Sequence, residues 1–239
     1  SAQGAKARQD LDSIRHNAMA AFGAQNRAIT REDYISRVYS MPSKFGSIAK
    51  AYIIGDTQIN TADKTYPAET IANQYALNLY VLAQDSSNCF VAPNQALLEN
   101  LRTYLSEYRM LTDAVNIKPA FIINLGVEFE VIPKPNYNSN EVVLSCINRL
   151  KTLLSKDRMQ INGSLNISSM ISDLDGLEGV QSIPTLDFYN VHKTSNGYSG
   201  NEYDIPGAIK NNILYPSLDP SIFEIKYPNA DIKGRAIRP

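Results

Sequence analysis

Residues 22–54 read FGAQNRAITREDYISRVYSMPSKFGSIAKAYII, and they hold the clearest local fold signals of the chain. Thr30 is followed three residues later by Asp33, which is the spacing of a capping box. The Thr30 hydroxyl can accept a hydrogen bond from the backbone N–H of Asp33, and the Asp33 carboxylate can accept one from the backbone of Thr30. A carboxylate here also suits the positive end of a helix dipole. The sequence therefore predicts a helix that begins directly after Thr30.

The same stretch predicts where that helix ends and which element comes after it. Helical spacing of apolar residues continues to Met41, and Pro42 disfavours helical geometry in the residue before it. Gly46 then separates the helix from an apolar run. We therefore expect a helix over 31–41 and a strand over 47–55.

The rest of the chain gives further helical and alternating patterns. The segment 121–131 is the most regular, because its six odd positions are apolar while most even positions are polar or glycine. Such a strand buries one face and exposes the other, as in an antiparallel sheet. The other expected elements are helices over 5–22, 93–108, 139–154 and 167–174, with Pro93 in the first turn of the second, and strands over 75–83 and 180–188.

These elements predict an α+β fold, in which amphipathic helices pack on small antiparallel or mixed sheets. We expect an N-terminal helical segment over 1–44 and the α+β core over 45–190. The segment 191–239 carries five prolines among short apolar groups. It is expected to be an irregular, extended C-terminal segment with one or two short strands and no core of its own.

Charge and composition exclude several classes of protein. The net charge is −1, with 23 basic and 24 acidic residues, so we expect neither nucleic-acid nor membrane binding. No apolar run reaches the length of a membrane span, and no signal-peptide pattern is present. Cys89 and Cys146 lie far apart and lack the spacing of a metal site. Together with the missing signal-peptide pattern, these two cysteines favour a reducing compartment. The chain begins at Ser1 without a methionine, so we expect it to be a piece of a longer protein.

Reactive groups are sparse. The histidines, His16 and His192, have no acid–base partners near them in sequence, and no glycine-rich phosphate-binding motif occurs. The acidic run 173–178 lacks the ligand spacing of a calcium loop. The prediction is no catalytic residue, no cofactor and no metal. The competing class, an enzyme or small-ligand domain with an unrecognised site, would have to use Asp187, His192 and Cys89.

Tyrosine is abundant, with fourteen copies and no tryptophan. Tyrosine offers contact area and a hydroxyl at little entropic cost, which suits protein–protein contacts. Aromatic residues of the C-terminal segment are therefore predicted to form an interface: Tyr198, Tyr203, Tyr215, Phe223 and Tyr227. The alternative is that these side chains simply cover a loop-rich surface.

Three blocks of the chain resemble one known family. The first block is carried by Ala24, Asn26, Arg27, Ala28, Ile29, Thr30, Glu32, Asp33, Tyr34, Pro42, Ile48, Lys50 and Ala51. The second block covers 101–131, with Leu101, Tyr104, Leu105, Arg109, Thr112 and Val115 ahead of the long strand, and the third runs from Ile161 to Val180. Together they are similar to the baseplate J-like family of contractile-tailed phages, and most similar to its T-even-type branch.

The resemblance implies a structural role without catalytic residues. Members form the inner scaffold of the tail baseplate, where six copies or pairs of copies close a ring. By this resemblance the chain is expected to form a homodimer within a six-fold ring and to bind other baseplate wedge proteins. It would lie in the virion at the tail baseplate, after assembly in the host cytoplasm. The T-even-type relative is longer, so the chain would correspond to its C-terminal portion.

Overall fold

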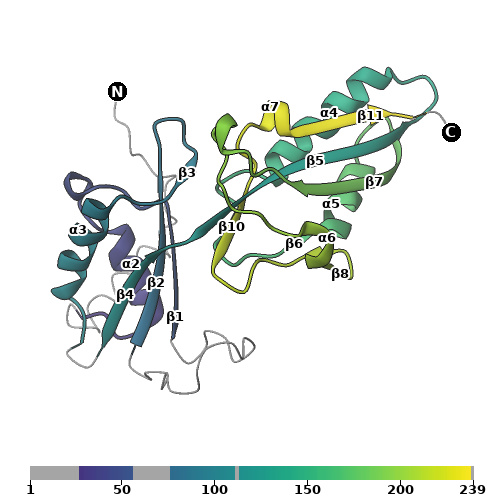
Figure 1. Ribbon diagram of the computed structural model, residues 1–239. Helices are drawn as coiled ribbons and strands as arrows, with labels where there is room; N and C mark the ends of the chain where they lie inside the picture. Colours follow the sequence, from purple (N-terminus) through teal and green to yellow (C-terminus); the bar gives the residue numbers. More distant parts are fainter. Residues whose placement is uncertain (1–26, 56–75, 111–112, 238–239) are drawn as a thin grey trace, which may run out of the picture.

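The computed structural model describes residues 27–55, 76–110 and 113–237, and these form two lobes (Figure 1). We call the described residues up to 119 the N-terminal lobe and residues 120–237 the C-terminal lobe. Strand β4 (Ala114–Pro119) belongs to the first lobe and leads through Ala120 directly into β5 (Phe121–Pro133) of the second. One nearly continuous extended segment therefore connects the two lobes.

The N-terminal lobe packs two helices on one four-stranded sheet. Strand β2 is central, because β1 pairs with it antiparallel, β4 pairs with it parallel, and β3 pairs antiparallel with its last residues. Helices α2 and α3 lie against this sheet (Figure 1). The other elements of the lobe are α2 (Arg31–Tyr39), η1 (Ser43–Phe45), β1 (Lys50–Gly55), β2 (Ala76–Gln84), β3 (Phe90–Val91) and α3 (Gln95–Ser106).

The predicted capping box is confirmed. The Asp33 backbone N–H donates to Thr30 Oγ1 at 3.1 Å, and the Thr30 N–H donates to Asp33 Oδ2 at 2.9 Å. The helix ends at Tyr39, two residues earlier than expected, and the Tyr39 hydroxyl accepts from the backbone N–H of Ala51 at 3.0 Å. The helix end thus holds the strand that comes after it in the sequence.

Strand β2 is buried on both faces, which explains its weak alternation. Leu79, Val81 and Ala83 belong to the hydrophobic cluster of the N-terminal lobe. Tyr80 and Leu82 point the other way, into the cluster of the C-terminal lobe. The first sheet therefore has α2 and α3 on one face and contacts the second lobe through the other.

The C-terminal lobe is built around β5. Strand β7 pairs with β5 antiparallel, while β10 and β11 both pair with it parallel, so the sheet is mixed. Helices α4 and α5 cover one face through the apolar side chains that the sequence predicted. The lobe also contains α4 (Ser139–Leu153), β6 (Leu165–Asn166), α5 (Ile167–Asp175), β7 (Val180–Asn190), η3 (Thr194–Asn196), α6 (Ile205–Ala208), β8 (Ile209–Lys210), β9 (Ile213–Leu214), β10 (Ser221–Glu224), α7 (Pro228–Asp231) and β11 (Ile232–Ala236).

The predicted α+β class is confirmed, with differences at β5 and in the C-terminal segment. Five of the six odd positions of β5 are buried, but Phe121 is 46% exposed, while the even positions Ile122, Asn124 and Gly126 are buried. These differences lie in the first six residues of β5, where the strand crosses between the lobes. The C-terminal segment supplies β10 and β11 to the sheet and buries Ile222, Phe223 and Ile232 in the core.

Two helix predictions are affected by the structure in different ways. Helix α3 is capped by the side chain of Asn94, which accepts from the Leu97 N–H at 2.8 Å, so Pro93 precedes the helix and is not in its first turn. The helix expected over 5–22, with His16, lies outside the described residues. Among the helices that the structure describes, none has both the length and the apolar character needed to cross a membrane.

Candidate interaction surfaces

The structure divides the predicted aromatic interface between buried and exposed positions. Phe223 is 2% exposed and packs in the core of the C-terminal lobe, so it does not face solvent. Tyr198 and Tyr203 are half-buried, whereas Tyr215 and Tyr227 are exposed. Only the latter two are exposed enough for a partner to contact, and the others lie beneath the surface of the lobe.

Tyr198 and Tyr227 form one aromatic group beside α7. Their rings meet edge to face with centroids 5.4 Å apart. The Tyr198 hydroxyl donates to Asp231 Oδ1 at 2.5 Å, and the backbone N–H of Tyr227 donates to Asp231 Oδ2 at 2.8 Å. Burial and then the Asp231 carboxylate raise the pKa of Tyr198 far above its usual range. Tyr198 is therefore uncharged, and its hydroxyl donates the hydrogen bond that holds its segment to Asp231.

Tyr203 and Tyr215 form a second group. The Tyr203 hydroxyl donates to the backbone carbonyl of Tyr215 at 2.9 Å, and its ring lies 6.2 Å from that of Phe223. The exposed Tyr215 thus stands on a segment that a half-buried tyrosine holds to the core.

Two further apolar residues are exposed on segments close to Tyr215 along the backbone, and the sequence patterns did not predict their exposure. Leu218 is 73% exposed, and Phe121 is exposed at the start of β5. The backbone N–H of Phe121 donates to the carbonyl of Pro220 at 3.1 Å, which brings their segments together. A leucine between Ser217 and Asp219, with Pro216 and Pro220 outside them, was the available signal, but sequence alone does not tell it from a core residue. We call Phe121, Tyr215 and Leu218 the apolar patch.

Residues 191–203 begin the C-terminal segment that the sequence predicts to be irregular and extended, and they are hydrogen-bonded along β5. We call these residues the strap. Its Val191 N–H donates to the carbonyl of Asn124 at 2.9 Å, and Ser199 Oγ and Asn201 Nδ2 both donate to the carbonyl of Ile122, at 2.6 and 2.9 Å. The strap continues the edge pairing of β5 beyond the point where β7 ends.

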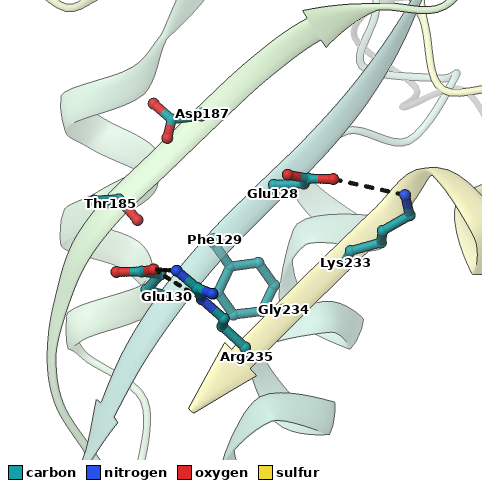
Figure 2. Close-up of a pocket in the computed structure, with 8 residues that line it drawn as sticks. All are labelled: Glu128, Phe129, Glu130, Thr185, Asp187, Lys233, Gly234 and Arg235. Carbon is teal, nitrogen blue, oxygen red and sulfur yellow. Dashed lines mark hydrogen bonds and ion pairs between the residues drawn. The ribbon is translucent and has the colours of Figure 1, made fainter. Parts of the chain in front are cut away.

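The outer face of the C-terminal sheet is charged (Figure 2). Glu128 lies 3.6 Å from Lys233 Nζ, and Arg235 pairs with Glu130 on the neighbouring strand. Asp187 stands opposite Glu128 on β7. These side chains line a shallow hollow of about 310 Å³ in which acidic residues of β5 and β7 lie beside basic residues of β11. Such pairs contribute little stability on an exposed face.

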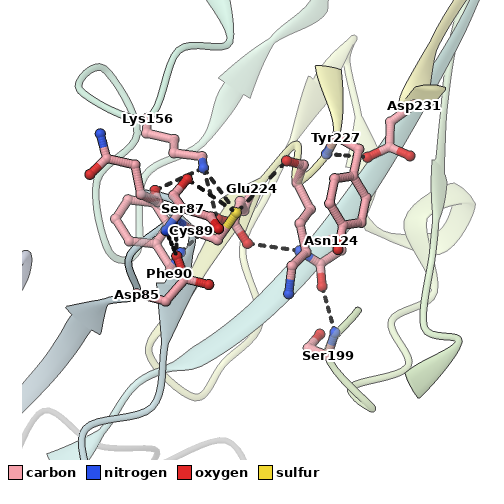
Figure 3. A network of polar contacts seen from close by, with 12 residues as sticks. Asp85, Ser87, Cys89, Phe90, Asn124, Lys156, Ser199, Glu224, Tyr227 and Asp231 are labelled. Carbon is pink, nitrogen blue, oxygen red and sulfur yellow. Dashed lines mark hydrogen bonds and ion pairs between the residues drawn. The ribbon is translucent and has the colours of Figure 1, made fainter. Parts of the chain in front are cut away.

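A second, partly buried polar cluster joins the two lobes (Figure 3). Glu224 at the end of β10 accepts from the backbone N–H of Phe90 in β3 and from Asn124 in β5. Beside it a cleft of about 390 Å³ runs between β3, β5 and the strap. The carboxylate and the Asn124 amide are hydrogen-bonded within the protein, and Asn124 Oδ1 accepts from the Ser199 N–H at 2.7 Å.

The residues of the competing enzyme hypothesis are not brought together in the described part of the chain. Cys89 is buried beside Lys156, and Asp187 is exposed on the outer face of β7. His192 is exposed in the strap, and no hydrogen bond or ion pair joins any two of the three. Cys146 is buried, and burial raises the pKa of its thiol to about 11. Within the described ranges, no cluster of three or more metal-ligating side chains occurs.

Comparisons with known proteins give one informative similarity. No family model matches the chain, and no curated protein matches its sequence. Eighteen chains of solved structures match its fold. One is a chain in the cryo-EM structure of the anti-feeding prophage (AFP) baseplate, 6-fold symmetrised, with a TM-score of 0.53 and 14% sequence identity. The match covers 93% of the present chain and 43% of that chain, so the present chain spans less than half its length.

Proposed function

We propose that this chain is a structural component of a phage tail baseplate wedge, where it self-associates in the inner ring and binds other wedge proteins. Within the J-like family we place it nearest the wedge protein encoded by gene six of T-even-type phages, as a C-terminal portion. The observation that carries the proposal is the fold that 93% of the present chain shares with part of an AFP baseplate chain. The three sequence blocks support it independently.

The apolar patch is the surface we assign to self-association, together with Tyr227. Exposed apolar side chains that gather at one place mark contact surfaces more often than single ones do. Leu218 and Tyr215 stand on a segment that is held to the core from beneath, so they can be covered without refolding. Of the predicted aromatic interface, this proposal keeps the exposed members Tyr215 and Tyr227, and it adds Phe121 and Leu218.

Sedimentation equilibrium over a wide range of protein concentration tests self-association. We expect a dimer that weakens at least about tenfold in Leu218→Glu or Tyr215→Glu, since burying one such side chain contributes roughly 1.5–3 kcal/mol. Leu144→Glu is the matched control, because Leu144 is also an exposed leucine but lies on α4. A chain that stays monomeric at the highest concentration argues against the proposal. Equal weakening by the control would place the contact elsewhere.

A further inference from the structure

Glu224 is a buried carboxylate at the boundary between the lobes (Figure 3). Its side chain is fully inaccessible to solvent. Oε1 accepts from the backbone N–H of Phe90 at 2.8 Å, and Oε2 accepts from Asn124 Nδ2 at 2.9 Å. Phe90 belongs to β3 of the N-terminal lobe, so the first of these bonds crosses the boundary.

Lys156 reaches the same point from the loop after α4. Its Nζ lies 3.7 Å from Glu224 Oε1 and donates to the carbonyl of Asn88 at 2.8 Å. Asn88 lies in the turn of the β2–β3 hairpin, which Asp85 closes by accepting from the Cys89 N–H at 2.8 Å. Glu224 and Lys156, two side chains of opposite charge from the C-terminal lobe, thus form hydrogen bonds to residues 85–91. We call residues 85–91 the hairpin tip.

The surroundings of Glu224 are otherwise those of a hydrophobic core. Phe90, Ile122, Phe223 and Ile225 are all buried in the same cluster. An apolar side chain of similar size would join the lobes without the desolvation cost of a buried carboxylate. With a carboxylate, the contact between the lobes depends on specific hydrogen-bond donors and on whether the carboxylate is protonated. The hydrogen bonds and the protonation state can both change without unfolding either lobe.

We propose that Glu224 is a latch between the lobes: its bonds to Phe90 and Asn124, with Lys156 beside them, hold the hairpin tip on the C-terminal lobe. Breaking them releases the tip, and with it the Phe90 ring, while the other members of the two hydrophobic clusters stay packed. The latch does not depend on the proposed function, because it concerns only contacts within one chain.

Hydrogen exchange resolved by residue tests the latch. In Glu224→Ala the amide of Phe90 loses its acceptor, so its protection factor should fall at least about tenfold, with smaller losses over the hairpin tip. Amides of α4 and of the centre of β5 should keep their protection. Glu128→Gln is the control: it removes a carboxylate from β5 that is exposed and ion-paired, and it should leave the tip unchanged.

A swapped pair separates the hydrogen-bond pattern from the mere presence of a glutamate. In Glu224→Gln the new side-chain NH₂ takes the place of the carboxylate oxygen that accepts from Asn124 Nδ2, so two donors face each other. This single variant should therefore weaken the protection of the tip. Combining Glu224→Gln with Asn124→Asp exchanges donor and acceptor between the two positions, and the new carboxylate can still accept from the Ser199 N–H. The double variant should recover most of the protection that the single variant loses.

The latch also predicts a dependence on pH. Burial raises the pKa of Glu224 above its ordinary value of 4.5, although the Phe90 amide, Lys156, Asn124 and Lys226 oppose this. The closed latch therefore holds a proton more readily than an open one. Protection of the tip, corrected for intrinsic exchange, should rise as pH falls from the raised pKa toward 4.5, and Glu224→Gln should remove this rise. Lys156, Lys226 and the Cys89 thiol are the other ionisable groups around the carboxylate.

Each remaining outcome overturns the proposal. If the tip exchanges at the wild-type rate in Glu224→Ala, the carboxylate does not hold it. If Glu224→Ala and the swapped pair both lose protection throughout the chain, Glu224 is a core residue on which folding depends. Either result leaves the self-association test unaffected.

Discussion

Single carboxylates close turns at several points of this protein. Asp33 accepts from the amides before α2, Asp85 from those of the hairpin tip, and Asp231 from Tyr227 and from a tyrosine hydroxyl. Each satisfies backbone donors that a helix end or turn would otherwise leave open. Polar side chains thereby fix irregular segments that carry few apolar residues.

Thr30→Ala should destabilise the N-terminal lobe by about 1 kcal/mol, because the amide of Asp33 loses its side-chain acceptor. Urea unfolding measures the change. Thr103→Ala is the matched control: Thr103 is also an exposed threonine, but its hydroxyl bonds back to Glu99 within α3, and such a bond adds little. Equal effects of the two substitutions would contradict the importance of the cap.

The cap also predicts how Asp33 titrates. Its slight burial would raise the pKa, but hydrogen bonds from Thr30 and Ile29 outweigh this and lower the pKa below the ordinary value of 3.8. The contribution of Asp33 to stability is therefore complete above pH 3.8 and is lost as pH falls through the lowered pKa. NMR titration of the carboxyl measures it, and a value at or above 3.8 would be inconsistent with the cap. Asp33→Asn should lose this acid dependence, whereas Glu32→Gln in the same turn should keep it.

At the scale of elements, the way strands approach one another depends on two glycines. A Cβ at Gly234 of β11 would lie 2.2 Å from Phe129 Cζ, and a Cβ at Gly126 of β5 would lie 2.2 Å from Tyr189 Cζ. The Phe129 ring is buried, whereas Tyr189 is only partly buried at the end of β7. The two rings therefore differ in their freedom to move aside.

Gly234→Ala should destabilise the C-terminal lobe by roughly 1–3 kcal/mol, because the buried Phe129 ring has no space to yield. Gly126→Ala should cost clearly less, since Tyr189 can turn toward solvent. Thermal unfolding of both variants gives the comparison. If Gly126→Ala proves the more damaging, this account of how β11 packs on β5 is incorrect.

Much of the element order was predictable from local patterns. The capping box, the stripe of α4 and the strand at β5 rest on short-range signals, and all three elements lie where the sequence places them, although the first half of β5 is buried on both faces. The pairing of β10 and β11 with β5 was not, because the register joins residues about 100 positions apart. The site showed the same division: an abundance of tyrosine suggested a contact surface, but only the fold shows that Phe223 is buried and Leu218 exposed.

At the scale of the whole molecule, strand β2 couples the lobes because it contributes to both hydrophobic clusters. Leu79 and Leu82 are both fully buried, yet they point to opposite lobes. Leu82→Ala should lower the cooperativity between the lobes and broaden or split the calorimetric transition. Leu79→Ala should destabilise the N-terminal lobe by about 2–5 kcal/mol. A single, equally sharp transition in Leu82→Ala would show that the lobes are coupled by other contacts.

The central claim concerns the place of this chain in a particle, and immunogold electron microscopy tests it most directly. Antibody raised against the purified chain would be applied to tail particles from cells that produce the protein. We predict gold at one end of the tail, where the baseplate lies, and none along the tube. Label that is absent from the particles, or spread along their length, would contradict the proposed role.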